Sequence, residues 1–169
     1  MPEDDDDAQA LERARRDAAE GKAPSTQAGE FVREEIHHVR EGKHGARSPK
    51  QAIAIGLSKA RRAGVDLPAP EAGAVPEETR RKAARDVAKG HQRVPSPTSA
   101  RRSRAVTSAL EREGRTAAAP SALARQARSS ARKRTASQRS AAAKRAARTK
   151  SPRARSAAAR KAQTRAREM

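Results

Sequence analysis

The residues with the clearest potential for chemistry lie between positions 30 and 44. Glu34 and His37, and likewise Glu35 and His38, have the Glu-x-x-His spacing with which di-metal carboxylate bundles bind ions. Such a centre needs two of these motifs and two further glutamates from a four-helix core, and the sequence offers one helix of this kind. We therefore predict no metal site and no cofactor. The remaining interpretation is a solvated acidic face, made of Glu30, Glu34, His37 and Glu41.

We also predict no catalytic residues. The sequence has no Gly-rich phosphate loop, no Ser-His-Asp set and no cysteine, which excludes disulfides and thiolate chemistry. Phe31 is the only aromatic residue and most apolar residues are alanine, so the chain has little with which to wall a substrate cavity. His44 and His91 lie in segments expected to be flexible, as phosphate neighbours or without a role. The sequence predicts a protein that is not an enzyme.

The charge of the chain points to polyanionic partners. Its 169 residues include 39 Lys and Arg against 20 Asp and Glu, a formal net charge of +19. Residues 115–169 hold 17 of these bases and one acid. Such a balance favours nucleic acid as the partner. No apolar run approaches the ~20 residues of a membrane span, and the acidic start does not resemble a secretory signal. We expect a cytoplasmic protein.

Two groups of basic residues are candidates for phosphate contacts. Lys43, Arg47 and Lys50 surround the N-terminus of a predicted helix, whose free N–H groups favour an anion; ordinary loop solubility is the alternative. The second group offers sequence-independent contacts and consists of Arg125, Arg128, Arg132, Lys133, Arg134, Arg139, Lys144, Arg145, Arg148, Lys150, Arg153, Arg155, Arg160 and Lys161. Aromatic side chains for stacking on single strands are nearly absent, so duplex DNA is favoured over RNA.

The best-specified element is a helix that begins after Ser48. Ser48 is a strong N-cap residue, and Gln51 completes an S-x-x-Q capping box. Pro49 suits the first helical position, where no N–H is needed. Gly64 can take the left-handed conformation that ends a helix, and Val65 is then placed to fold back onto the last turn. Agreement among such local signals is typical of a segment that folds.

A second amphipathic helix is predicted over residues 27–41, capped by Ser25 or Thr26 and ended by a glycine. The short connection between the two helices predicts an antiparallel helical hairpin over residues 25–69. Gly56 inside the later helix costs ~1 kcal/mol relative to alanine. We expect close approach of the partner helix to compensate for this cost.

Ile55 lies off the main apolar stripe of its helix and is predicted to contact a protein, such as a second copy of the hairpin. Domains of ~40 residues commonly need a staple or an oligomer, and no cysteine is available as a staple. A homodimer through the hairpin is therefore a candidate assembly.

The predicted fold is all-α: a short antiparallel helical hairpin with disordered or loosely helical flanks. Four segments are expected, because the apolar content is too low to order the whole chain. They are an acidic disordered tail at 1–24, the hairpin domain at 25–69, a weakly helical region at 70–114 and a basic low-complexity tail at 115–169. The weakly helical region holds two candidate helices, one from Pro76 to Lys89 and one after Pro97.

Two resemblances add to this. Arg40-Glu41-Gly42-Lys43 and the run KQAIAIGLSKA from Lys50 to Ala60 resemble a small bacterial domain family of unknown function. The basic tail resembles those of linker histones and bacterial histone-like proteins. The first resemblance implies an architecture and a bacterial setting, and the second implies contact with DNA phosphates.

The function predicted from the sequence is that of a histone-like, nucleoid-associated protein that grips duplex DNA through its tail. Two alternatives stay open. One is an RNA- or ribosome-associated basic protein, and the other is an adaptor that uses the helical hairpin to bind a protein partner.

Overall fold

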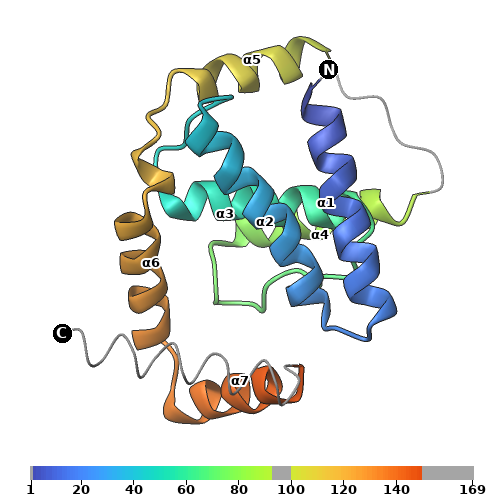
Figure 1. Cartoon of the computed structure of the whole chain (residues 1–169), viewed down its shortest axis with the longest axis vertical. Helices are drawn as coiled ribbons and strands as arrows, with labels where there is room; N and C mark the ends of the chain where they lie inside the picture. The colour runs from blue at the N-terminus through green and yellow to red at the C-terminus, as the bar shows by residue number, and fades with distance from the viewer. Residues whose placement is uncertain (1, 93–99, 150–169) are drawn as a thin grey trace. The chain divides into compact units, whose positions relative to one another are not determined.

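The structure is a computed structural model that describes residues 2–92 and 100–149. These residues contain helices and no strand, so the all-α prediction is confirmed. The arrangement is a multi-helix bundle rather than a short hairpin (Figure 1). Its elements are α1 (Pro2–Ala19), α2 (Pro24–Glu41), α3 (Pro49–Arg62), α4 (Glu77–Gly90), α5 (Ala100–Glu111), the 3₁₀ helix η1 (Thr116–Ala118), α6 (Pro120–Arg132) and α7 (Ala136–Thr149).

The chain forms two compact units, Met1–Gln126 and Ala127–Met169. The first unit holds α1 to α5, η1 and the start of α6, and the described part of the second holds the end of α6 and α7. The four predicted segments, with boundaries at residues 24, 69 and 114, were drawn from local composition and stay a prediction. The contacts between helices described below run across those positions.

Helices α2 and α3 form the predicted hairpin. Ser48 Oγ accepts a hydrogen bond from the Gln51 N–H at 3.3 Å, and Gln51 Oε1 accepts one from the Arg47 N–H at 2.8 Å. The chain leaves α3 through Gly64 at φ +90°, and Val65 N–H donates to the Ala60 carbonyl at 3.0 Å. The predicted start and end of this helix are confirmed.

The start of α2 differs from the prediction. The helix begins at Pro24, with Ala23 as its N-cap residue and no side-chain cap. Proline suits this first position because its missing N–H is one that the helix leaves unpaired in any case. Ser25 and Thr26 therefore lie inside the first turn instead of capping it. The helix ends at Gly42, whose φ of +82° is left-handed, as expected.

Gly56 lies where α2 and α3 come closest. A Cβ atom at this position would lie 2.7 Å from the Val32 Cα and 3.0 Å from the Phe31 carbonyl oxygen. No side chain fits in that space, so the expected close approach of the partner helix is confirmed.

Helix α1 occupies the segment predicted as a disordered acidic tail. It packs beside α2 (Figure 1). The contact is made by Ala10 and Ala14, which are buried together with Phe31. Leu11 and Leu57 pack against the edge of this cluster. The sequence pattern gave no sign of it because this contact uses alanines, whose small size permits close packing without an obvious apolar stripe.

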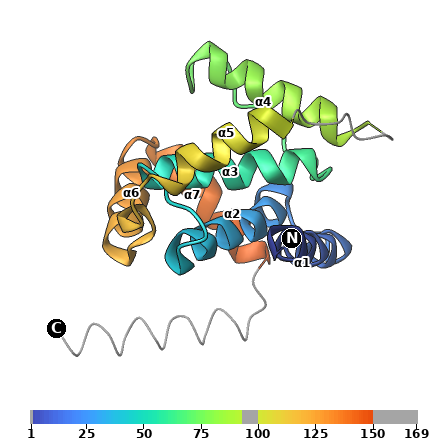
Figure 2. The same ribbon diagram turned by 90° about the horizontal axis from the view of Figure 1, so that it is seen from above.

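Helix α4 packs on α3, which lies between α4 and the α1–α2 pair in Figure 2. Ala83 is buried, and Ser58 Oγ donates a hydrogen bond to Asp86. A Cβ atom on Gly90 would lie 2.0 Å from the Arg61 carbonyl oxygen, so the end of α4 touches the backbone of α3. The first helix of the weakly helical region thus docks on the hairpin.

The loop between α2 and α3 is held by backbone hydrogen bonds to α5 and to the turn that follows α5. Gly45 N–H donates to the Leu110 carbonyl at 2.9 Å, and Ala46 N–H donates to the Gly114 carbonyl at 3.0 Å. A second small core, formed by Val39, Ala46, Ala52, Ala117 and Ala118, lies beneath this loop. The loop that carries His44 is therefore fixed to the structure at the two residues that follow this histidine.

Candidate functional site

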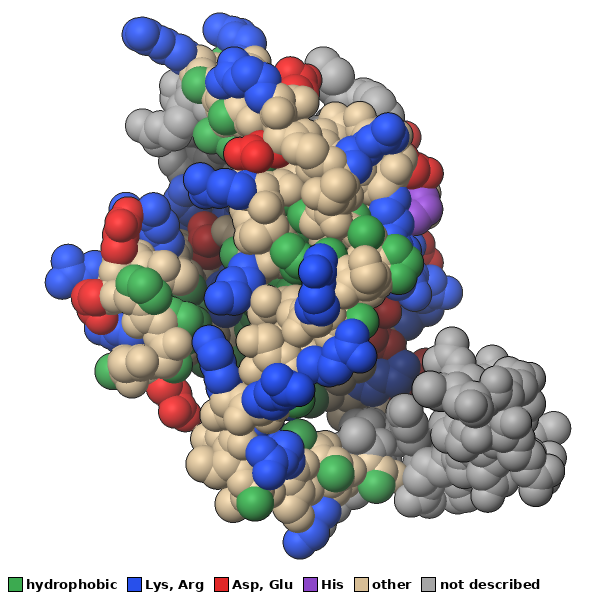
Figure 3. All heavy atoms as spheres, turned by 90° about the vertical axis from the view of Figure 1, so that its left-hand side faces the viewer, with side chains coloured by type: hydrophobic (Ala, Val, Ile, Leu, Met, Phe, Trp, Pro, Cys, Tyr) green, Lys and Arg blue, Asp and Glu red, His purple; other side chains and the backbone are tan. Residues whose placement is uncertain are grey.

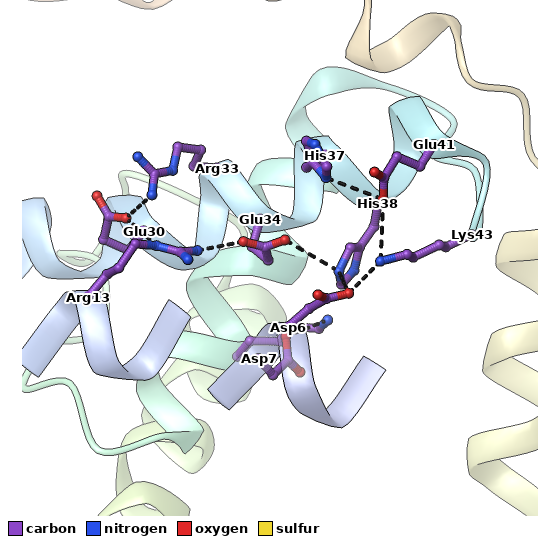
Figure 4. Close-up of polar contacts among 11 residues, drawn as sticks. Asp6, Asp7, Arg13, Glu30, Arg33, Glu34, His37, His38, Glu41 and Lys43 are labelled. Atoms are coloured by element: carbon purple, nitrogen blue, oxygen red, sulfur yellow. Dashed lines mark hydrogen bonds and ion pairs between the residues drawn. The ribbon is translucent and has the colours of Figure 1, made fainter. Parts of the chain in front are cut away.

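The first group of predicted phosphate contacts consists of Lys43, Arg47 and Lys50, and these three side chains have different surroundings. Lys43 is paired with Asp6 of α1 and with Glu41 Oε2, the latter at 3.3 Å (Figure 4). The hydrogen bond from Lys43 also holds the pKa of Asp6 below its ordinary value. Arg47 and Lys50 are exposed. Two of the three cations are thus open to an anion, while the third already has carboxylate partners.

The second group lies largely on α6 and α7. Arg125, Arg128 and Arg132 are at positions i, i+3 and i+7 of α6, which places them on one face, and all three are exposed. The exposed Lys133 and Arg134 follow. Helix α7 holds Arg139, Lys144, Arg145 and Arg148. The candidates outside the described residues are Lys150, Arg153, Arg155, Arg160 and Lys161.

Ile55, the predicted protein contact, is half-buried. It lines a cavity of about 440 Å³ together with Ile53 and Leu57 of α3 and with Val75 and Ala83 from the neighbouring α4 region. Part of this face of α3 is therefore covered by the chain itself. The contact with a second protein stays a prediction.

The predicted acidic face of α2 is half covered by α1. Arg13 reaches across from α1 and donates to Glu30 Oε2 at 2.9 Å and to Glu34 Oε2 at 2.5 Å (Figure 4). His37 and Glu41 remain exposed and pair with each other at 3.3 Å. The interpretation as a solvated face holds for the last turns of the helix only, because α1 docks beside the earlier ones.

A buried polar cluster lies beneath this face, and the sequence analysis did not predict it. Glu35 and His38 of α2 are fully buried, and His44 of the following loop is 8% exposed. One ligand-type atom from each of the three lies within 4.8 Å of the others. The rings of His38 and His44 meet edge to face, with their centroids 6.0 Å apart. The cluster thus gathers two imidazoles and one carboxylate away from water.

Lys59 of α3 borders the cluster. Its Nζ is 3.3 Å from Glu35 Oε2 and 3.1 Å from Asp7 Oδ1. Burial acts to lower the pKa of Lys59, but the two carboxylates outweigh it and raise the pKa above its ordinary value. The ammonium group therefore stays charged, and it occupies one side of the Glu35 carboxylate.

One signal in the sequence does point to this cluster. Phe31, Glu35 and His38 are spaced i, i+4 and i+7, so the two polar residues share a helical face with the only aromatic side chain. Polar residues on the face of the largest apolar side chain are candidates for burial. The third member, His44, depends on how its loop docks and has no comparable local signal.

A comparison with known protein families matches the part of the chain that forms the α2–α3 hairpin. Residues 21–70 match a family described as "Family of unknown function (DUF6496)". The match spans α2, α3 and the loop with His44, and it supports an uncharacterised domain family for this part of the chain. No curated protein and no solved structure matches the chain. Among the described residues, no helix has the length and apolar character needed to cross a membrane.

Proposed function

We propose that the protein is a non-enzymatic, histone-like DNA-binding protein of the bacterial nucleoid. In this proposal, the basic C-terminal segment contacts the phosphates of duplex DNA. The observation that carries the proposal is the unequal distribution of acidic residues along the chain: residues 1–126 hold 19 Asp and Glu against 24 Lys and Arg, whereas residues 127–169 hold one against 15.

Several cations of the first unit have carboxylate partners. Arg13, Lys43 and Lys59 join α1 to α2 and α3 through carboxylates. In α4, Glu77 accepts from Arg80 at 2.8 Å and from Arg81 at 3.2 Å, and Lys82 pairs with Glu78 at 2.6 Å. These cations already have neutralising partners, so they gain less than unpaired ones from a phosphate.

The C-terminal segment, residues 120–169, contains few acids that could serve as such partners. Residues 127–169 include 15 Lys and Arg, and Glu168 is their only acid. Among the described residues, no acidic side chain pairs with Arg125, Arg128 or Arg132 of α6. Basic side chains also stand out from the surface at many points of the face drawn in Figure 3. A polyanion with closely spaced charges is the partner that such a segment fits, because each Lys or Arg can neutralise one phosphate and release counterions.

A salt titration tests the proposal. With ~6–10 phosphate contacts, the affinity of the full chain for a duplex should fall ~10³–10⁵-fold between about 50 and 200 mM salt. The triple variant Arg125→Gln, Arg128→Gln, Arg132→Gln removes three unpaired cations. It should reduce the slope of log K against log salt by roughly 0.9 per lost contact, or about 3 in total.

The matched control is Arg80→Gln, Arg81→Gln, Lys82→Gln, which removes the same charge from cations that already have carboxylate partners. Its slope should stay close to that of the parent chain. Equal losses in both variants would mean that binding follows net charge alone, and the assignment to the C-terminal segment would then be wrong. Tighter binding to duplex RNA or ribosomes at matched salt would favour the RNA alternative.

A further inference from the structure

The buried cluster of Glu35, His38 and His44 contains more hydrogen-bond acceptors than donors. Both carboxylate oxygens of Glu35 and Nδ1 of His38 are buried and have no hydrogen-bond partner of acceptable geometry among the described residues. The Lys59 and His44 nitrogens lie near Glu35 at ion-pair distance only, 3.3 Å in each case. Leaving a buried polar group unpaired costs about 1–3 kcal/mol, and more for a charged one.

The protons on His44 can be assigned from its contacts. Its Nδ1 lies 3.1 Å from the Gly45 carbonyl oxygen, which can only accept, so Nδ1 carries the proton. In the neutral ring, Nε2 then carries a lone pair. This Nε2 atom lies 3.3 Å from Glu35 Oε1. With a neutral His44 ring and an ionised Glu35, two acceptors meet at this distance with no proton between them.

His38 repeats this arrangement. Its Nε2 lies 3.1 Å from Asp6 Oδ2 and 3.7 Å from Glu34 Oε1 (Figure 4). Carboxylates accept hydrogen bonds, so the proton of the neutral ring belongs on Nε2, and Nδ1 is a lone pair. That nitrogen is the one that is buried and unpartnered. Each histidine therefore has one nitrogen fixed by an oxygen acceptor and a free lone pair on the other.

We propose that Glu35, His38 and His44 form a binding site for a divalent transition-metal ion, with Zn²⁺ as the ion of choice. The ligand atoms are Glu35 Oε1, His38 Nδ1 and His44 Nε2. Two imidazoles and a carboxylate are a donor set that zinc accepts in proteins. A cation among the three lone pairs also removes the mismatch of acceptors, which Lys59 cannot do because it lies beside Glu35 Oε2.

The surroundings match those of bound metals in two respects. Metal-ligating histidines donate their other N–H to a carboxylate or a backbone carbonyl, and here Asp6 and the Gly45 carbonyl take those positions. Zinc holds its ligands ~2.0–2.2 Å away, which puts tetrahedral ligand atoms about 3.3–3.6 Å apart. The His44–Glu35 pair is already at 3.3 Å. One ring nitrogen of His38 lies within 4.8 Å of the other two ligand atoms, so those two separations must shorten by up to about 1.5 Å.

This site differs from the di-metal pattern considered in the sequence. It uses one Glu-x-x-His pair, Glu35 and His38, and takes its third ligand from the loop after the helix. The backbone bonds from Gly45 and Ala46 to residues 110 and 114 hold that loop in place. The site lies wholly in the first unit and uses none of the residues proposed to contact DNA.

The first test measures metal uptake by the full chain after treatment with a chelator. Titration with Zn²⁺ alone, followed by calorimetry, should give one ion per chain, and added Zn²⁺ should raise the melting temperature because it binds the folded state. Co²⁺ as a probe should give the visible absorption of a four- or five-coordinate ion. Absence of saturable uptake, or a Co²⁺ spectrum of an octahedral aquo ion only, would overturn the proposal.

Variants locate the ion. His44→Gln should weaken Zn²⁺ binding by more than ~100-fold, since even second-shell changes cost ~10–100-fold. The matched control is His91→Gln, which changes an exposed histidine far along the chain and should leave the affinity unchanged. Circular dichroism of each variant without metal shows whether the fold is kept. Equal losses in both variants would contradict the assignment.

A second pair of variants separates this site from its neighbour. Asp6, Glu34 and His38 also bring ligand-type atoms within 4.8 Å of one another. Glu35→Gln should abolish binding, whereas Glu34→Gln should keep it within a few-fold. The opposite result would place the ion at the outer cluster and overturn the proposal. If Glu35→Gln fails to fold, the comparison of His44→Gln and Glu34→Gln with the parent chain decides.

Discussion

At the scale of single residues, two glycines in helices have opposite surroundings. Gly56 of α3 faces the backbone of α2, where an added Cβ would lie 2.7 Å from the Val32 Cα. Gly29 of α2 has no atom within 4 Å of the same position. Glycine in a helix is destabilising by about 0.5–1 kcal/mol relative to alanine. Only at Gly56 does the packing of the helices require that cost.

Substitution by alanine should have opposite effects on stability at these two glycines. Gly56→Ala should lower the free energy of unfolding by about 1–3 kcal/mol, because the helices must move apart to admit the methyl group. Gly29→Ala should raise it by about 0.5–1 kcal/mol, because the exposed helix gains propensity without a clash. Urea denaturation of both variants measures this difference. A stabilising effect at both sites would show that the helices are not in contact at Gly56.

Single residues also show what the sequence can and cannot predict. Ser48 and Gly64 were correctly placed at the ends of α3 because capping depends on neighbours within a few residues. The burial of His44 depends instead on backbone bonds to residues 110 and 114, more than sixty positions away. Sequence patterns within a few residues do not predict such a distant contact. The cluster was therefore missed although two of its members share the face of Phe31.

At the scale of elements, α1 shows how a charged helix can dock without large apolar side chains. Ala10 and Ala14 are 0% and 2% exposed, so their small side chains lie directly against the bundle. Arg13, on the same helix, bridges two carboxylates of α2. A search for large apolar residues finds only Leu11 here, and for that reason the sequence predicted disorder.

The docking of α1 can be tested with two arginines of the same helix. Arg13→Gln removes the bridge to Glu30 and Glu34 and should destabilise the fold by about 1 kcal/mol, a value that allows for the partial exposure of the pair. Arg15→Gln makes the same change at an exposed position and should stay within about 0.5 kcal/mol of the parent chain. Thermal denaturation followed by circular dichroism compares them. Equal stability of the two variants would mean that the bridge does not anchor α1.

At the scale of the whole molecule, charge and compactness divide the chain at about the same place. Residues 1–126 hold 24 Lys and Arg against 19 Asp and Glu, and residues 127–169 hold 15 against one. The first unit contains the close helix contacts and both small cores. The second adds little apolar surface but most of the net charge. The excess of Lys and Arg in the tail could be predicted from composition. The extent of the folded unit could not, since it depends on how α1 and α4 dock.

This division predicts the behaviour of a chain that ends at Gln126. Its unfolding should remain cooperative, with a melting temperature close to that of the full chain, because α1 to α5 and η1 keep their contacts. Its Zn²⁺ uptake should also be unchanged, since Glu35, His38 and His44 all lie before the cut. Duplex binding should be lost for the most part, because 15 of the 39 basic residues are removed and those that remain are nearly balanced by acids. Melting curves, zinc calorimetry and a duplex titration at low salt measure the three properties.

A shortened chain that kept both its affinity for the duplex and its salt slope would place the DNA contacts on the helical bundle. The exposed Arg47 and Lys50 at the start of α3 would then be the first residues to change.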